Sequence, residues 1–415
     1  MQVRIINIVI RGLVMVSRFI FLFALVKWLK PAEVGSYGLL VAAVSYSIYL
    51  VGLDFYTYTT RQISGGERMN WGWYIKCQVT LSALLYSITF PFLILIFLFG
   101  WLPWDLAGWF FIVLVLEYFC LEAIRFFIAA SEQISASIVL FLNQAFWAVA
   151  AVIFMATHDG YQQLNYVLFA WCMGSVAALV YSFFKIKSMC LGGWSDAVDF
   201  RWIWTGIKVA VPLLIATLAF RGIFTFDRYL IKEFLSLEIV AVYVFFIGVA
   251  GTLLAFLDAA VFSFAYPSMI NAYKNKDANL FKKNMKIMFF SVIALSVVFA
   301  LSSLFVFPYM LVWIGKAAYS DSYFVFYWVL LAMIINSFWM IFHYALYAQQ
   351  HDRQIIYSHV SAFFIFLIVS YCVHFYYPNE SVLVGLCISQ LLILAWKVSA
   401  YRYLTPTAFL GFGLK

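Results

Sequence analysis

The sequence predicts an all-α polytopic membrane protein with about twelve transmembrane helices, and three observations support this. Of its 415 residues, 66% are hydrophobic and only 11% are charged, and the mean hydropathy is +0.97. A water-soluble chain of this length could not bury so much apolar surface. Apolar runs of about 20 residues, the length that crosses a bilayer as a helix, follow one another along the chain. These runs are continuous rather than alternating, which favours helices over a barrel.

The runs define the expected spans. The first is too long for a signal peptide and is followed by Lys27 and Lys30 rather than by a small-residue cleavage site, so we expect it to be retained. The expected spans are 5–29, 34–55, 74–100, 108–128, 134–156, 165–184, 206–230, 239–263, 286–310, 323–346, 355–375 and 382–404.

The distribution of Lys and Arg predicts the orientation of the chain. An even number of spans places both termini on one side, and seventeen basic residues flank the spans on that side against five on the other. Because cytoplasmic loops are enriched in Lys and Arg, we expect both termini to be cytoplasmic. The seventeen are Arg4, Arg61, Arg68, Lys76, Lys185, Lys187, Arg201, Lys208, Lys274, Lys276, Lys282, Lys283, Lys286, Arg353, Lys397, Arg402 and Lys415.

The chain divides near its midpoint. A polar stretch from Lys185 to Arg201 separates the halves, and we expect a six-helix lobe over 1–190, a cytoplasmic linker over 191–205 and a second six-helix lobe over 206–415. A short internal repeat supports this, because the six residues from Arg18 match those from Arg221 at four positions. Six spans per half predict a pseudo-two-fold axis along the membrane normal.

The first span carries arginines at intervals of seven, Arg4, Arg11 and Arg18. Seven residues are nearly two helical turns, so the three guanidinium groups share one stripe with roughly 10 Å between neighbours. Arg18 is expected near mid-membrane, where an arginine costs several kcal/mol unless it faces water, a carboxylate or an anion. We therefore expect the stripe to face a polar cavity.

Other ionisable residues fall on the first, second and fourth spans of each half, whereas spans 5, 6, 9, 11 and 12 lack a comparable central charge. This pattern predicts a shared central cavity that attracts an anionic group, with carboxylates tuning it or relaying protons. The candidates are Arg11, Arg18, Asp54, Glu117, Glu122, Arg125, Arg221, Asp227, Arg228, Asp258 and His343.

A structural interpretation remains open for several of these residues. Glu122 and Arg125, spaced i and i+3, would also pair on one helix face. Asp54, Asp227 and Arg228 would also suit the membrane interface. The remaining histidines lie in loops or near span ends and carry no functional signal: His158, His351, His359 and His374.

No catalytic motif is found. The chain has no P-loop, no D-x-D pair and no H-x-x-x-x-D motif, so we expect a protein that is not an enzyme and needs no cofactor. Its six cysteines are scattered and mostly lie within apolar runs, as small core residues do. The formal charge of +8 is not gathered in a soluble module, which argues against a nucleic-acid partner.

The chain resembles the polysaccharide transporter family of the multidrug/oligosaccharidyl-lipid/polysaccharide (MOP) exporter superfamily, and within it the Wzx-type O-antigen flippases. The resemblance rests on a diffuse pattern over most of the chain. Its residues are Leu29-Lys-Pro-Ala-Glu-Val-Gly-Ser-Tyr-Gly-Leu, Gly52-Leu-Asp-Phe, Arg61, Ile207-Lys-Val-Ala-Val-Pro-Leu-Leu, Phe226-Asp-Arg-Tyr-Leu and Leu311-Val-Trp-Ile-Gly.

This resemblance implies two lobes around a central cavity, alternating access, and transfer of an undecaprenyl-diphosphate-linked oligosaccharide across the bacterial inner membrane. The diphosphate would meet Arg11, Arg18, Arg125 and Arg221. A polysaccharide polymerase and a chain-length regulator are the implied protein partners. Coupling to H⁺ or Na⁺ through Glu117, Glu122 or Asp258 is left open.

Three other functions remain as alternatives. One is a cation-coupled exporter of drugs or metabolites, for which a net acidic cavity is expected. A second is an integral membrane glycosyl- or acyltransferase, and the third is a peptidoglycan-precursor flippase. The basic groups near mid-membrane favour an anionic substrate over a cationic one.

Overall fold

The computed structural model describes residues 2–411, without the side chains of residues 2–5 and 8. Helices and their connections account for this part of the chain, and no strand occurs in it. Among residues 2–411, eleven helices are long and apolar enough to cross a membrane. A twelfth helix, α6 (Ala107–Ala129), has 23 residues but carries Glu117, Glu122 and Arg125. Each predicted span corresponds to a helix, so the predicted all-α polytopic fold is confirmed.

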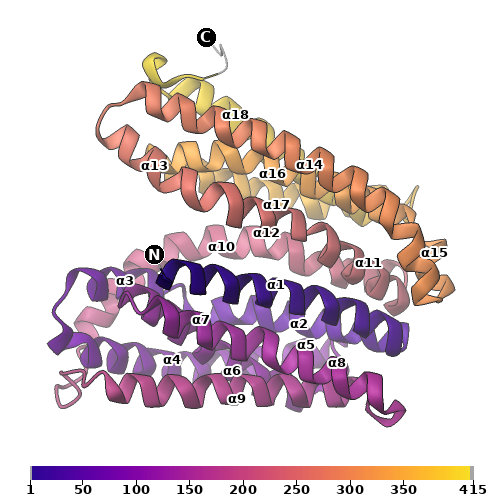
Figure 1. The fold of residues 1–415 in the computed structure, drawn as a ribbon, viewed down its shortest axis with the longest axis horizontal. Coiled ribbons are helices and arrows are strands. Elements are labelled where there is room, and N and C mark those ends of the chain that lie inside the picture. Colours follow the sequence, from indigo (N-terminus) through magenta and orange to yellow (C-terminus); the bar gives the residue numbers. More distant parts are fainter. Residues whose placement is uncertain (1, 412–415) are drawn as a thin grey trace. The chain divides into compact units, whose positions relative to one another are not determined.

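Two compact units make up the chain, residues Met1–Leu218 and Ala219–Lys415. The division falls inside a continuous helix, α10 (Phe200–Phe234). The first unit contains, besides α6 and the start of α10, the helices α1 (Gln2–Trp28), α2 (Pro31–Gly52), α3 (Tyr56–Gly65), α4 (Trp71–Leu93), α5 (Leu95–Leu98), α7 (Gln133–Phe141), α8 (Trp147–Thr157) and α9 (Leu164–Ser188). Within each unit the long helices lie side by side (Figure 1). The predicted organisation into two six-helix lobes joined by a linker at 191–205 stays a prediction.

The second unit follows the same plan of long helices with short connections. Besides the end of α10, it contains α11 (Leu237–Ala250), α12 (Thr252–Leu257), α13 (Ser263–Lys274), α14 (Ala278–Ile314), α15 (Ala317–Asp321), α16 (Phe324–Ala348), α17 (Asp352–His374) and α18 (Ser381–Leu404). Each unit also contains one π-helical turn, Leu142–Phe146 between α7 and α8 and Asp258–Phe262 between α12 and α13. A π turn adds a residue to a helix and often marks a functional position.

Loops that the topology assigns to one side of the membrane meet at one end of the first unit. The Arg68 guanidinium donates to the Met189 carbonyl at 2.6 Å, and Lys76 Nζ donates to the carbonyls of Trp194 and Asp196 at 3.1 and 2.9 Å. At the other end, Glu33 Oε1 accepts from the Leu164 amide at 3.1 Å. The linker between the predicted lobes is therefore docked against α4 and belongs to the first unit.

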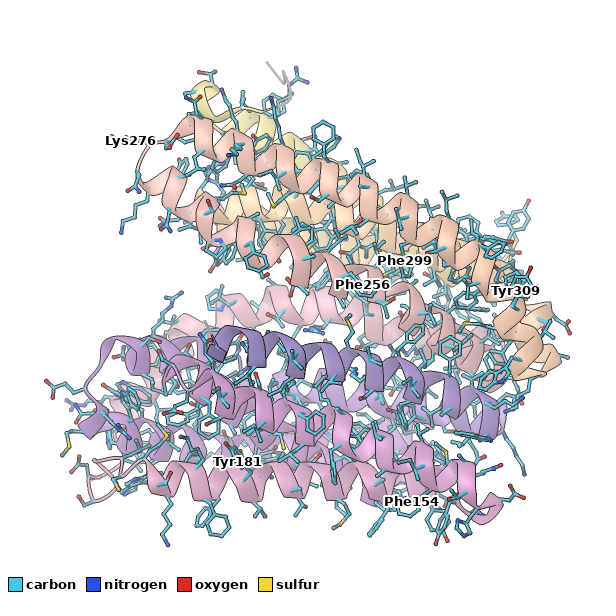
Figure 2. The ribbon with its side chains drawn as sticks, viewed as in Figure 1. Phe154, Tyr181, Phe256, Lys276, Phe299 and Tyr309 are labelled. Carbon is cyan, nitrogen blue, oxygen red and sulfur yellow. The ribbon has the colours of Figure 1, made fainter. Side chains whose placement is uncertain are left out.

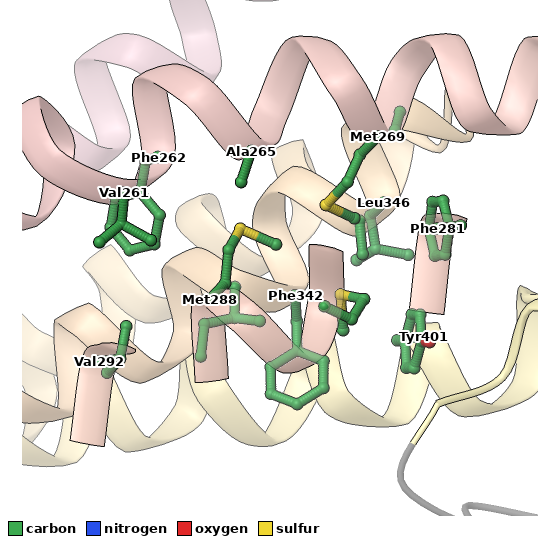
Figure 3. Packing of buried hydrophobic residues seen from close by; sticks show 14 of the residues in the cluster. Val261, Phe262, Ala265, Met269, Phe281, Met288, Val292, Phe342, Leu346 and Tyr401 are labelled. Carbon is green, nitrogen blue, oxygen red and sulfur yellow. The ribbon is translucent and has the colours of Figure 1, made fainter. Parts of the chain in front are cut away.

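The core of the second unit is a cluster of buried apolar side chains from α12 to α18 (Figure 3). Met269, Met285 and Met288 are fully buried in it. Figure 2 shows Lys276 and Tyr309 near opposite ends of α14, which runs along the whole unit. Phe409, from the turn after α18, lies 5.5 Å from the Phe281 ring, so the C-terminal segment packs beside the start of α14. The basic segment 274–286 and the C-terminal segment thus lie at one end, as the predicted topology requires.

Lys397 was counted among the basic residues that flank the spans, and this placement is wrong. Lys397 lies inside α18 and has no exposed surface. The count of flanking bases therefore falls from seventeen to sixteen, against five on the other side. The direction of the asymmetry is unchanged, and the cytoplasmic placement of the termini stays a prediction.

Close packing of α17 on α18 depends on Gly385. A Cβ atom at this position would collide with the buried Ser370 hydroxyl and lie 3.1 Å from the Phe366 carbonyl oxygen. Bulk added to a packed core typically costs about 1–3 kcal/mol. We therefore expect Gly385→Val to lower the thermal unfolding temperature of the purified protein. Gly12→Val, also inside a helix but with nothing within 4 Å, should leave it nearly unchanged, and equal effects would contradict this account.

Candidate functional site

The arginines of α1 lie on a flank of the helix that is separate from its exposed apolar stripe. Arg11 and Arg18 are exposed, and the side chain of Arg4 lies outside the described residues. The apolar stripe comprises Ile6, Val9, Leu13, Val16 and Ile20, each 44–54% exposed. At 100° per residue, the two arginines project from roughly the opposite side of α1. The helix thus presents an apolar surface and a cationic surface in different directions.

Arg18 is oriented by a neutral partner. Its Nη1 atom donates to Gln144 Oε1 at 3.3 Å. Gln144 lies in the π turn Leu142–Phe146. Within this turn, the Asn143 carbonyl accepts a hydrogen bond from Trp147 Nε1 at 2.7 Å. Because an amide carries no charge, this contact fixes the guanidinium without neutralising it.

Glu117 is the centre of a polar network between α6, the π turn and α9. Its Oε1 atom accepts from Trp171 Nε1 at 2.6 Å and from Ser175 Oγ at 3.2 Å, and its Oε2 atom accepts from Asn143 Nδ2 at 3.2 Å. Ser175 Oγ also lies 2.9 Å from Asn143 Oδ1. The Arg18 guanidinium is close enough to interact electrostatically with this carboxylate. The predicted candidates Arg18 and Glu117 therefore lie in one continuous network.

Aromatic rings surround this network. Trp147 and Trp171 are stacked with ring centroids 5.8 Å apart, and Phe21 lies edge-on to Trp147 at 4.9 Å. Tyr37 contacts both Phe21 and Trp171, with centroids 6.0 and 6.1 Å away. Such rings exclude water from the carboxylate and fix the donors around it.

Glu122 and Arg125 form an ion pair on one face of α6, as the structural interpretation of their spacing requires. Arg125 Nη1 donates to Glu122 Oε1 at 2.5 Å, and each side chain is 15% exposed. Gln78 from α4 donates to the other carboxylate oxygen. The Arg125 guanidinium also lies over the Tyr56 ring, 3.4 Å from its centroid. Arg125 is thus neutralised by a carboxylate in direct contact, whereas Arg18 donates a hydrogen bond to the neutral amide of Gln144.

These residues line a cavity of about 270 Å³ between α3, α4, α6 and α9. Its wall is mostly apolar, with the ion pair at one side. Burial raises the pKa of the Tyr56 phenol, while the nearby Arg125 guanidinium acts in the opposite direction. The predicted candidate Asp54 is close enough to Tyr56 and Glu122 to interact with both electrostatically. Asp54 is buried in a left-handed backbone conformation at φ +52° just after α2.

In the second unit, the predicted candidate residues lie at separate positions and do not form one site. Asp227 is completely buried, and its Oδ2 atom accepts from the Tyr243 hydroxyl at 2.5 Å. Its Oδ1 atom accepts from the backbone amide of Arg228 at 2.6 Å. Arg221, on the same helix, is exposed. Asp258 and His343 line a crevice of about 310 Å³ together with Tyr266, Tyr344 and Tyr347.

Sequence reasoning missed Lys397 and His359, which contact each other inside the second unit at 3.0 Å. His359 is only 7% exposed and lies within α17. Span 12 was expected to lack a central charge, and the buried Lys397 lies within it. The predicted span 382–404 already enclosed Lys397, which was the available signal.

The ion pair on α6 leads to a test of stability. Arg125→Leu would leave the Glu122 carboxylate buried without its partner, which typically costs about 3–5 kcal/mol. We expect a large fall in the thermal unfolding temperature, and recovery of most of it in the double variant Glu122→Gln/Arg125→Leu. Lys185→Leu breaks the more exposed pair with Glu132 and should cost less than about 1 kcal/mol. A double variant no more stable than Arg125→Leu would contradict the pairing.

No protein-family model and no curated protein sequence matches the chain. Solved structures do match over nearly its whole length. One is an inward-facing multidrug resistance MATE family transporter of the MOP superfamily, with a TM-score of 0.71 at 10% identity over 94% of this chain and 96% of that one. A second is a MATE protein in complex with MaD3S, with a TM-score of 0.64 at 10% identity over 95% of this chain and 93% of that one.

The Vibrio cholerae MATE transporter VcmN is also similar, with a TM-score of 0.59 at 13% identity over 98% of this chain and 97% of that one. At such identities the likeness concerns the fold. The chain therefore has the fold of MATE transporters, one of which is described as a member of the MOP superfamily.

Proposed function

We propose that the protein is a flippase that moves an undecaprenyl-diphosphate-linked oligosaccharide across the bacterial inner membrane by alternating access. The observation that carries the proposal is the cationic flank of α1. Arg11 and Arg18 are exposed inside a helix long enough to span the membrane, and Arg18 is held by a neutral amide. A guanidinium that keeps its charge in such a place is suited to an anion that enters the membrane region.

A diphosphate suits these groups chemically. The planar guanidinium donates two parallel hydrogen bonds to a phosphate and stays charged at any physiological pH. Arg11 and Arg18 are seven residues apart, and roughly 10 Å of helix separates them, so one side chain can follow the diphosphate while the other meets the first sugars. Arg221 is the proposed counterpart from α10, and Arg125 has a weaker claim because Glu122 neutralises it.

The carboxylates play a supporting role in this proposal. Glu117 is held by three neutral donors, so it sets the position of the π turn that carries Gln144, and thereby the position of Arg18. Alternating access would come from movement of one lobe against the other, as in transporters built from repeated halves. The oligosaccharide would cross past the cationic flank of α1, while the polyprenyl tail stays in lipid.

The main competing function is export of cationic drugs, and the cavity beside Glu122 is the feature that would serve it. This cavity is mostly apolar and has a carboxylate at its wall. However, Arg125 lies in the same wall and pairs with that carboxylate at 2.5 Å, which neutralises it. Transport of a cationic dye by purified protein, with no movement of a lipid-linked sugar, would favour the exporter. Turnover of a labelled sugar or acyl donor would favour a transferase.

Substitution of the exposed arginines tests the flippase proposal. The protein would be reconstituted in vesicles containing a fluorescent polyprenyl-diphosphate-linked sugar, and a membrane-impermeant reductant would report the fraction that reaches the outer leaflet. Hydrogen bonds to charged groups contribute about 1.5–3 kcal/mol, so we expect Arg18→Ala and Arg221→Ala to slow flipping at least about tenfold. Arg18→Lys should retain part of the activity because its charge remains.

Arg353→Ala removes an exposed arginine at the start of α17 and serves as the matched control. It should flip the lipid at the rate of the unmodified protein. Monodisperse elution in detergent would show that each variant is folded. Flipping at an unchanged rate in both Arg18→Ala and Arg221→Ala would contradict the role of these arginines.

A further inference from the structure

A lysine and two histidines form a cluster inside the second unit, and we propose that it is the proton-binding site through which transport is coupled to proton movement. This inference rests on the proposed transport function and names the ion that drives it. Lys397 from α18 is fully buried, with its Nζ atom 3.2 Å from His343 Nδ1 and 3.0 Å from His359 Nε2. His343 and His359 come from α16 and α17.

The geometry suits an ammonium group held by neutral acceptors. A protonated lysine has three N–H donors and no acceptor. Two of them are directed to the imidazole nitrogens, and the third finds the face of Trp339, whose centroid lies 3.7 Å from Nζ. Trp339 Nε1 in turn donates to Gln390 Oε1 at 2.8 Å, which fixes the ring. Every donor of the ammonium therefore has a partner, and none of these partners is an anion.

The cluster can hold one extra proton but not two. In the described part of the chain no carboxylate forms an ion pair with Lys397, so a second positive charge beside it would be uncompensated in a low-dielectric interior. The bound proton can be shared between Nζ and either imidazole: when Lys397 transfers it, the lysine becomes a neutral amine and the histidine becomes an imidazolium. Three nitrogen atoms that already bind a proton do not suit Na⁺, which prefers oxygen ligands.

Other titratable groups face the cluster from the elements packed around it. The crevice beside His343 contributes Asp258 from the π turn, Tyr266 from α13, and Tyr344 and Tyr347 from α16. Arg221 follows Phe220 on α10. Tyr401, one turn beyond Lys397 on α18, donates its hydroxyl to the Phe409 carbonyl at 3.1 Å and so does not face the cluster. Of these, Asp258 is the acid, and it interacts with the Tyr344 hydroxyl.

His343 connects the buried lysine to the crevice. Its Nδ1 atom contacts Lys397, while its ring lines the crevice of about 310 Å³ that also contains Asp258. The cluster lies five to seven residues from the end of α16, the start of α17 and the end of α18, which is roughly 8–10 Å along each helix. A proton can therefore pass from the crevice to His343 and then to Lys397 without crossing the apolar core.

The cluster also contacts the helix that carries Arg221. The Phe220 ring is stacked on His359, with centroids 4.8 Å apart and planes at 27°. A protonated imidazole is attracted to an aromatic face much more strongly than a neutral one. The location of the proton therefore changes the force on α10 one residue before Arg221, and this is the physical link between proton binding and the substrate arginines.

The first experiment measures proton binding without any substrate. The chain has five histidines, so a protein labelled with ¹⁵N only in histidine gives few ring signals in vesicles. Ring ¹⁵N shifts distinguish neutral from protonated imidazole, and single His→Gln variants assign them. We expect the signals of His343 and His359 to change together between about pH 5 and 9, and to shift in Lys397→Met. Signals of these two rings that are insensitive to both pH and Lys397→Met would overturn the site.

Lys397→Met is a suitable variant because replacing a buried charge by an apolar side chain of similar shape is often neutral for folding. Lys283→Met, an exposed lysine of the same unit, is the matched control and should leave both histidine signals unchanged. An equal response to both substitutions would show an unspecific effect and overturn the assignment.

The second experiment measures coupling. In the flipping assay, a pH gradient should change the final distribution of the lipid-linked sugar by up to about tenfold per pH unit for one coupled proton. Lys397→Met and His359→Gln should still equilibrate the lipid but show no dependence on the gradient. A gradient effect that persists in these variants, or flipping by the unmodified protein that ignores the gradient, would overturn the inference while the flippase stands. Absence of any flipping would instead overturn the proposed function, and the ¹⁵N experiment would then decide the proton site alone.

Discussion

The cost of placing charge inside a hydrocarbon layer is the constraint on which this structure depends. Three different arrangements meet it. Arg18 is oriented by the neutral amide of Gln144 and remains exposed, and Arg125 is neutralised by Glu122 at 2.5 Å. Lys397 is buried among two imidazoles and an indole. The contact with Gln144 leaves the charge of Arg18 available to a ligand, and the ion pair neutralises the charge of Arg125. The surroundings of Lys397 make its charge sensitive to protonation.

The helices could be predicted from the sequence because the lengths of the apolar runs are set by the thickness of a bilayer. The i, i+3 spacing of Glu122 and Arg125 likewise predicted that they could pair, since it places both on one helix face. The role of Gln144 could not be predicted, because it depends on a π turn that shifts the helix register at Leu142–Phe146. Lys397 and His359 could not be linked either, because they lie 38 residues apart on different helices and meet only by packing.

The two units use the same kind of helix in different ways. The internal repeat aligns Arg18 with Arg221, and both arginines are exposed. Their surroundings differ, because the carboxylate network of Glu117 lies near Arg18, whereas a histidine stacked on Phe220 lies near Arg221. Carboxylates keep one charge state over a wide range of pH, whereas imidazoles change theirs near neutrality. The first unit is therefore chemically suited to constant binding and the second to a response.

The composition of α6 has a consequence for how the chain is made. It carries three charged residues, Glu117, Glu122 and Arg125, and its partners on α4, Gln78 and Ser82, belong to the segment synthesised just before it. A helix with three charged residues partitions poorly from the translocon by itself. We expect α4 to wait at the translocon until α6 emerges, so that the two leave for the lipid as a hairpin whose polar groups are already matched. The order of synthesis would thus lower the barrier to inserting α6.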